Sequence, residues 1–131
     1  MSDQSFTVTI DARFRDLDTM GHVNNSVFAT YLEEARVAYF RDVIGVPLHA
    51  ADTVVAHLTI DYHSPIQCED EIVITLEVAE LGNSSIHIAY DVHTNETLAA
   101  SAETVQVVWD PETESSRPLP QPWRDQIEID D

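Results

Sequence analysis

The longest regular pattern of hydrophobic positions runs from Ser26 to Ile44. Apolar residues recur there at intervals of three and four, the spacing of one helix face, and they are Phe28, Tyr31, Leu32, Ala35, Ala38, Tyr39 and Val43. Asn24 and Asn25 are good N-cap residues, and Gly45 interrupts the pattern at its end. We therefore predict one long helix of roughly 20 residues, about 30 Å from end to end.

Five segments alternate between apolar and polar residues as β-strands do, namely 6–14, 54–64, 72–80, 86–93 and 98–109. Gly82 and Asn83 mark a hairpin turn, and a second turn falls at 94–97. We expect the last four strands to pair in succession as an antiparallel meander, with the helix against the apolar face. The predicted fold is α+β, a curved antiparallel sheet of five strands wrapped around one long central helix.

The chain has 131 residues, which predicts one domain over residues 1–131. From about residue 110 the composition changes, because four of the six prolines lie there. We predict an irregular, acidic and proline-rich tail that lies across the body through Leu119 and Trp123 and frays at its acidic end.

The 24 acidic and 6 basic residues give a net charge of −18, and every basic residue is Arg. Such a surface repels nucleic acid and anionic membranes, so neither is an expected partner. The lysine-free, acidic composition resembles that of proteins from salt-accumulating organisms. At molar salt the Debye length is about 3 Å, which screens the repulsion between carboxylates.

Cys68 is the single cysteine, which excludes an internal disulfide and fits a reducing compartment. The N-terminal stretch, residues 1–10, is too short and too polar for a signal peptide, so we expect a cytoplasmic protein. The six histidines form no metal-ligand spacing, and we expect neither a metal nor another cofactor. No serine lies in a G-x-S-x-G turn, and Cys68 has no cationic neighbour that would activate it.

The candidate chemistry lies just before the helix. Asp16 and Asp18 precede the helix start, and Gly21 allows a tight turn between them and the cap. The first amides of a helix have no partner within it and favour a developing oxyanion. A carboxylate beside them suits hydrolysis of an activated carbonyl, by direct attack or by deprotonation of water. The alternative is that these residues only form a turn and a cap.

The order of these residues resembles a known family. The stretch D-x-D-x-x-G-H-V-N-N, followed by Y-L-E-E-A-R, is similar to the acyl-CoA thioesterases of the hotdog fold, the 4-hydroxybenzoyl-CoA thioesterase type. The resemblance implies that Asp18 is the catalytic carboxylate and that an amide close to Asn25 polarises the thioester carbonyl. It also places an acidic residue of the central helix at Glu33 or Glu34, which some branches of the family use for catalysis.

The same resemblance implies further roles. His22 and Glu33 would support catalysis, His22 by orienting the substrate or Asp18, and the alternative for His22 is a purely structural hydrogen bond. The expected substrate-binding residues are Gly21, Val23, Asn24, Phe28 and Tyr31. The expected partners are an acyl-CoA substrate and further copies of the chain, as a homodimer or a homotetramer. Four arginines, Arg13, Arg15, Arg36 and Arg41, would contact coenzyme A phosphates or pair with neighbouring carboxylates.

Two other functions fit the same fold. One is a non-catalytic module that binds acyl-CoA, and only an assay of turnover separates it from a thioesterase. The other is a hydratase, which the sequence disfavours because its Asp and His pairing is not visible. The sequence leaves open which acyl group is accepted and whether Asp18 acts as nucleophile or base.

Overall fold

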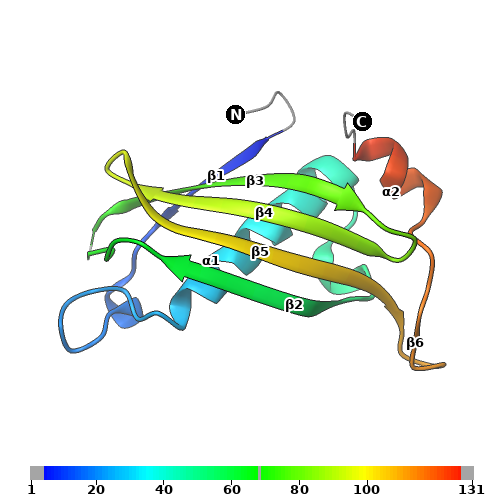
Figure 1. The fold of residues 1–131 in the computed structure, drawn as a ribbon, viewed down its shortest axis with the longest axis horizontal. Helices are drawn as coiled ribbons and strands as arrows, with labels where there is room; N and C mark the ends of the chain where they lie inside the picture. The colour runs from blue at the N-terminus through cyan, green and yellow to red at the C-terminus, as the bar shows by residue number, and fades with distance from the viewer. Residues whose placement is uncertain (1–4, 68, 128–131) are drawn as a thin grey trace.

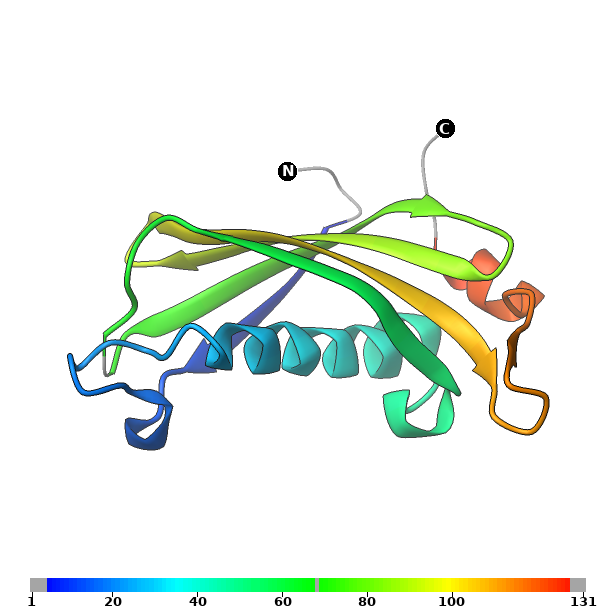
Figure 2. The ribbon, with the colours of Figure 1, turned by 60° about the horizontal axis from the view of Figure 1, so that its bottom comes forward.

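The computed structural model describes residues 5–67 and 69–127 as a curved antiparallel sheet that covers one side of a central helix (Figures 1 and 2). The five long strands lie in the order β1-β3-β4-β5-β2. Their bounds are β1 Phe6–Asp11, β2 Thr53–Tyr62, β3 Glu71–Leu81, β4 Ser85–Thr94 and β5 Thr97–Asp110. The predicted five-stranded sheet around one long helix is confirmed.

The predicted meander of four strands is wrong for β2. Strands β3, β4 and β5 do pair in succession, but β2 pairs with β5, from Thr53 opposite Val108 to Tyr62 opposite Ala100. Strands β2 and β3 therefore do not form a hairpin. The segment that connects them runs past the start of the helix, where the Ile66 carbonyl accepts a hydrogen bond from the Val23 amide at 2.7 Å. Strand β1 therefore takes the place beside β3.

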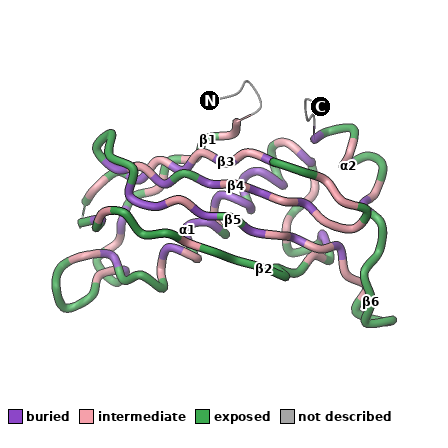
Figure 3. The backbone as a smooth tube through the Cα atoms, in the orientation of Figure 1, coloured by how far each residue is buried: buried purple, intermediate pink, exposed green. Residues whose placement is uncertain are grey.

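The outer strands differ from the central ones in exposure. Strand β2 forms one edge of the sheet and is mostly exposed, whereas β3, β4 and β5 bury alternate residues (Figure 3). Strand β1 ends at Asp11, earlier than predicted, and Phe14 lies in a short 3₁₀-helix, η1 (Phe14–Asp16), with 84% of its surface exposed. A second 3₁₀-helix, η3 (Leu48–Ala50), occupies the loop after the central helix.

The central helix consists of α1 (Val27–Tyr39) and a π-helical turn, η2 (Phe40–Ile44). It begins later than predicted because the side chain of Asn24 forms a turn, accepting hydrogen bonds from the amide of Ser26 at 3.0 Å and from its hydroxyl at 2.8 Å. The predicted end is confirmed. Gly45 has a φ of 88°, which a residue without a Cβ adopts most easily.

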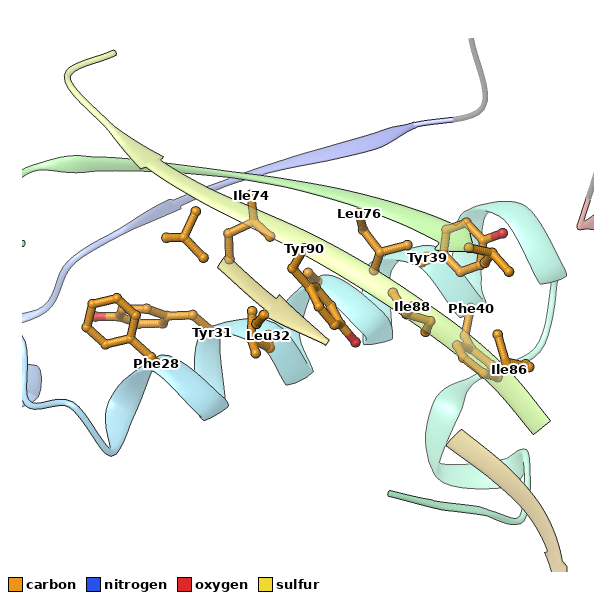
Figure 4. Close-up of a cluster of buried hydrophobic side chains, with 14 of the residues drawn as sticks. Phe28, Tyr31, Leu32, Tyr39, Phe40, Ile74, Leu76, Ile86, Ile88 and Tyr90 are labelled. Carbon is orange, nitrogen blue, oxygen red and sulfur yellow. The ribbon is translucent and has the colours of Figure 1, made fainter. Parts of the chain in front are cut away.

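The core lies between the helix and the concave face of the sheet (Figure 4). The helix buries the apolar face predicted from its spacing, including Phe28, Leu32 and Tyr39. Strands β3 and β4 bury the predicted alternate residues, Ile72, Ile74, Leu76, Val78, Ile86, Ile88, Tyr90 and Val92. Each fully buried side chain of this size contributes about 1.5–3 kcal/mol, so this interface is the main source of stability.

The tail is more regular than predicted. It contains a two-residue strand, β6 (Ser115–Ser116), paired with β5, and a short helix, α2 (Gln121–Gln126). Leu119 and Trp123 are buried as predicted, and the Trp123 ring meets that of Phe40 edge-on with centroids 5.7 Å apart. Cys68 and residues 128–131, the acidic end that was predicted to fray, lie outside the described residues. Within the described chain, no helix is both long enough and apolar enough to cross a membrane.

Candidate active site

Asp18 lies at the start of a tight turn that holds its carboxylate in place. The amide of Asp18 donates to the His22 carbonyl at 2.7 Å, and the Gly21 amide donates back to the Asp18 carbonyl at 3.2 Å. Gly21 has a φ of 78°, so the turn needs glycine there. One carboxylate oxygen, Oδ1, accepts hydrogen bonds from the amides of Met20 at 2.8 Å and His22 at 3.2 Å. No described residue donates to Oδ2, which leaves one oriented oxygen for a reactant.

Asp16 has a different environment, although it is only two residues away. Its side chain is buried, and Oδ2 accepts hydrogen bonds from the Tyr31 hydroxyl at 2.6 Å and from Arg13 Nε at 3.2 Å and the Arg13 amide at 3.0 Å. Burial raises the pKa of Asp16, but the hydrogen bonds from Tyr31 and Arg13 outweigh burial and hold the pKa below its ordinary value. Asp16 is therefore a structural anchor.

The start of the helix presents an amide beside this turn. Ser26, Val27 and Phe28 donate their amides to acceptors on Asn24 and Asn25. No acceptor among the described residues hydrogen bonds with the amide of Asn25. An unused amide at a helix start is a suitable donor to a developing oxyanion.

Asp18 and Asn25 line one cavity of 260 Å³. Its walls come from the Asp18 turn, the start of α1 and the end of β2, and the lining residues are Asp18, His22, Val23, Asn25, Phe28, Tyr62, His63, Ser64 and Pro65. The Tyr62 hydroxyl donates to the Asn25 carbonyl at 2.8 Å, and the Tyr62 ring meets that of Phe28 edge-on with centroids 5.0 Å apart. Strand β2 thus supports the helix start from the opposite side.

The structure brings most of the predicted site residues together. His22, Val23 and Phe28 line the cavity with Asp18 and Asn25, while Gly21 and Asn24 shape the turns that hold it. Tyr31 lies elsewhere, because it is fully buried and bound to Asp16.

Glu33 also lies away from Asp18. It lines a larger cavity of 630 Å³ between the helix and the start of β2, whose lining residues are Glu33, Arg36, Val37, Arg41, Pro47, Leu48, His49, Thr53, Val55 and Gln106. Of the four arginines expected near coenzyme A, Arg13 pairs with Asp16 and Glu34, and Arg41 pairs with Asp42.

Sequence reasoning missed four residues of the smaller cavity, Tyr62, His63, Ser64 and Pro65. Tyr62 ends β2 and the other three residues follow it, far from the motif in sequence, and only the strand order places them against the helix start. The one available signal was a polar pair immediately before Ser64 and Pro65, where a strand must end.

Comparison with known proteins identifies the family of this chain. Residues 12–127 match the thioesterase-like superfamily. The 1,4-dihydroxy-2-naphthoyl-CoA hydrolase of Synechococcus elongatus is 28% identical over 138 residues, covering 98% of each chain. A thioesterase from Thermus thermophilus, solved with coenzyme A and Zn, is 38% identical with a TM-score of 0.85, covering 92% of this chain and 90% of that one.

Slr0204, a 1,4-dihydroxy-2-naphthoyl-CoA thioesterase from Synechocystis, shares the fold with a TM-score of 0.86 at 24% identity, covering 94% of this chain and 95% of its own. The chain belongs to the thioesterase-like superfamily. The prediction of a hotdog-fold acyl-CoA thioesterase is thereby confirmed.

Proposed function

We propose that Asp18 is the carboxylate with which this acyl-CoA thioesterase adds water to the thioester, releasing a carboxylic acid and free coenzyme A. The support is geometric, because Oδ1 is held by two amides while Oδ2 faces no donor among the described residues. Oδ2 either takes a proton from water or attacks the thioester carbonyl. The amide of Asn25 donates to the oxygen that becomes negative as the carbonyl is attacked.

Other residues of the cavity have supporting roles in this proposal. The imidazole of His22 orients the substrate or the Asp18 carboxylate, and Val23 and Phe28 form the apolar wall. Gly21 and Asn24 keep the two turns in shape. Tyr62 holds the carbonyl of Asn25, so it fixes the peptide unit that follows the proposed oxyanion donor.

The test is thiol release from a panel of acyl-CoA thioesters in molar KCl, comparing wild type with Asp18→Asn. We expect the variant to lose about 10²–10⁴-fold in kcat/KM, the usual contribution of a positioned base. Asp91→Asn makes the same chemical change on an exposed residue of β4 and should match wild type. If wild type and Asp18→Asn release thiol at one background rate while still binding the thioesters, the chain is a non-catalytic acyl-CoA module.

The exposed edge of the sheet supports a homodimer. Strand β2 and the helix beside it expose large apolar residues, and Val37, Val54, Val55, Leu58 and Tyr62 are each 42–44% exposed. An edge strand with such residues is a template for pairing with a second strand. Antiparallel pairing of two β2 strands about a two-fold axis would continue the sheet and cover these residues.

Such a dimer would also combine the two cavities. Thr53 and Val55, early in β2, line the larger cavity, and Tyr62, at its end, lines the Asp18 cavity. Antiparallel pairing places the start of one β2 beside the end of the other. The larger cavity of each copy then faces the Asp18 cavity of the second copy, and Glu33 of one chain lies near the reaction centre of the other.

Sedimentation equilibrium at molar KCl tests the assembly, with twice or four times the 14.7 kDa chain mass expected. Leu58→Glu, which places a charge in the middle of the edge, should shift the mass to that of one chain. A wild-type enzyme that is active as a single chain would contradict the shared site.

The acidic surface and the coenzyme A substrate support a cytoplasmic enzyme that works in concentrated salt. A net charge of −18 on 131 residues disfavours the compact state through self-repulsion unless counterions screen it.

A further inference from the structure

The larger cavity contains two deeply buried polar side chains, each with an unused hydrogen-bonding atom. Arg36 is 5% exposed and Gln106 is 3% exposed. Arg36 donates from Nη1 to the Tyr90 hydroxyl at 3.2 Å, and Gln106 donates from Nε2 to the Thr53 hydroxyl at 2.8 Å. Within the described residues, Arg36 Nε and Gln106 Oε1 have no partner.

Arg36 is a buried cation without a counter-charge. Among the described residues no carboxylate lies within 4.0 Å of its guanidinium, although the chain has 24 acidic residues. Glu34 pairs with Arg13 instead, and Glu33 lines the same cavity without forming an ion pair. A buried charge without an ionic partner costs stability, so its position needs an explanation other than folding.

The shape and lining of the cavity suit an organic group. Its volume of 630 Å³ lies within the range of small-molecule sites, and Val37, Pro47, Leu48 and Val55 provide apolar walls in the cavity that Arg36 also lines. Arg41 also lines this cavity but is paired with Asp42, so Arg36 is the arginine of the lining that has no carboxylate partner among the described residues.

We propose that Arg36 is a specificity-determining residue that binds a negatively charged oxygen on the acyl group of the substrate, a carboxylate or an ionised ring hydroxyl. This proposal depends on the thioesterase function proposed above. The face of the guanidinium that lines the cavity donates to that oxygen, and the apolar walls pack against the carbon skeleton. In the two-fold dimer the thioester carbonyl of the same acyl group then lies toward Asp18 of the second copy.

The phosphates of coenzyme A are the other source of negative oxygen. They are strongly hydrated, whereas Arg36 is only 5% exposed and lines its cavity together with apolar residues. The acyl group is the part of the substrate that loses water on binding, so the buried cation favours the acyl end.

The experiment compares matched pairs of thioesters, glutaryl-CoA with pentanoyl-CoA and 4-hydroxybenzoyl-CoA with benzoyl-CoA. Wild type should prefer at least one charged or ionisable member over its unsubstituted partner by about tenfold to a hundredfold in kcat/KM, the usual effect of a hydrogen bond to a charged group. Arg36→Met, which keeps the length of the side chain, should abolish that preference through KM, while hydrolysis of the unsubstituted partner continues. The pair whose preference Arg36→Met abolishes shows whether the group that Arg36 binds is a carboxylate or a ring hydroxyl.

Arg117→Met is the matched control, because it changes the net charge equally at an exposed residue outside the cavity. It should keep the wild-type preference. Gln106→Leu should weaken the preference less than Arg36→Met, since it removes no charge. A thermal melt completes the set, and we expect Arg36→Met to melt at or above the wild-type temperature.

Four outcomes overturn the proposal. If wild type has equal kcat/KM within both pairs, Arg36 does not recognise the acyl group, although the protein is still a thioesterase. A preference for CoA over 3′-dephospho-CoA thioesters that Arg36→Met abolishes assigns Arg36 to a phosphate. A lower melting temperature of Arg36→Met, with all thioesters affected equally, makes the residue structural. If wild type releases no thiol from any thioester, the proposed thioesterase function is itself wrong.

A mixing experiment tests whether the site is shared. Heterodimers of Asp18→Asn with Arg36→Met contain one site with both residues intact if the two act across the interface. A random mixture should then recover about a quarter of the wild-type rate on the charged substrate. If the rate of the mixture does not exceed the sum of the rates of the two separate variants, both residues act within one chain. That result contradicts a site shared between two chains.

Discussion

The two aspartates of the D-x-D motif give matched variants, because Asp16→Asn and Asp18→Asn make the same chemical change two residues apart. In Asp16 a single oxygen accepts three hydrogen bonds, from the Tyr31 hydroxyl and from the amide and Nε of Arg13. Hydrogen bonds to charged groups contribute about 1.5–3 kcal/mol, against 0.5–1.5 kcal/mol for neutral ones. Asparagine keeps an acceptor oxygen, so the loss is about 1 kcal/mol per bond.

The Arg13 side chain is 39% exposed, and solvent screening reduces its share. We therefore expect Asp16→Asn to lower the free energy of unfolding by about 2 kcal/mol, which is roughly 6–10 °C in melting temperature for a domain of this size. Asp18→Asn should change stability by less than about 0.5 kcal/mol, because its Oδ1 can still accept from Met20 and His22.

Thermal melts at one protein concentration and one salt concentration, together with thiol-release kinetics, separate the two effects. The expected pattern is a lower melting temperature with most activity retained for Asp16→Asn, and an unchanged melt with lost activity for Asp18→Asn. The reverse pattern, or loss of turnover in Asp16→Asn without destabilisation, would refute the division between anchor and catalyst.

Four further predictions follow from the same residues. Gly21→Ala has free space for its Cβ but must keep a φ of 78°, so it should cost about 1–2 kcal/mol and lower kcat/KM, as a melt and thiol assay will show. Because folding lowers the pKa of Asp16, its stabilisation is present above the unfolded value near 3.8 and is lost as pH falls through the folded pKa. Urea midpoints of wild type and Asp16→Asn should therefore converge in acid, and a constant gap would reject this. Tyr62→Phe removes the hydrogen bond to Asn25 and should cost about 1 kcal/mol of stability while lowering kcat. Dialysis from molar to millimolar KCl should weaken the fold, and an unchanged circular dichroism melt would reject the salt requirement.

Local patterns predicted most of the elements of this protein. The spacing from Phe28 to Tyr39 identified the buried helix face, and the alternation in β3 and β4 identified the residues that pack against it. Such patterns are informative because burial on one face repeats with the period of the element itself. The motif that we propose to be catalytic was equally readable, since the Asp18 turn and the helix start are adjacent in sequence.

Strand order and the partners of individual side chains depended on the tertiary structure. The alternation of apolar and polar residues in β2 does not predict whether β2 pairs with β3 or with β5, because strand pairing depends on contacts between residues far apart in sequence. That choice brings Tyr62 to the Asn25 carbonyl and leaves apolar residues of β2 exposed at one edge of the sheet. The separation of Asp16 from Asp18 likewise depended on Tyr31, fifteen positions further along.

The sequence alone predicted the buried apolar faces of α1, β3 and β4 and the turn that holds the proposed catalytic carboxylate, since both follow from neighbours within a few positions. Only the tertiary structure decided that Arg36 is buried beside Gln106 with no carboxylate near it, because that arrangement joins the helix to a strand seventy positions away. Periodicity records the side on which a residue lies, whereas its contacts depend on which distant segment packs there.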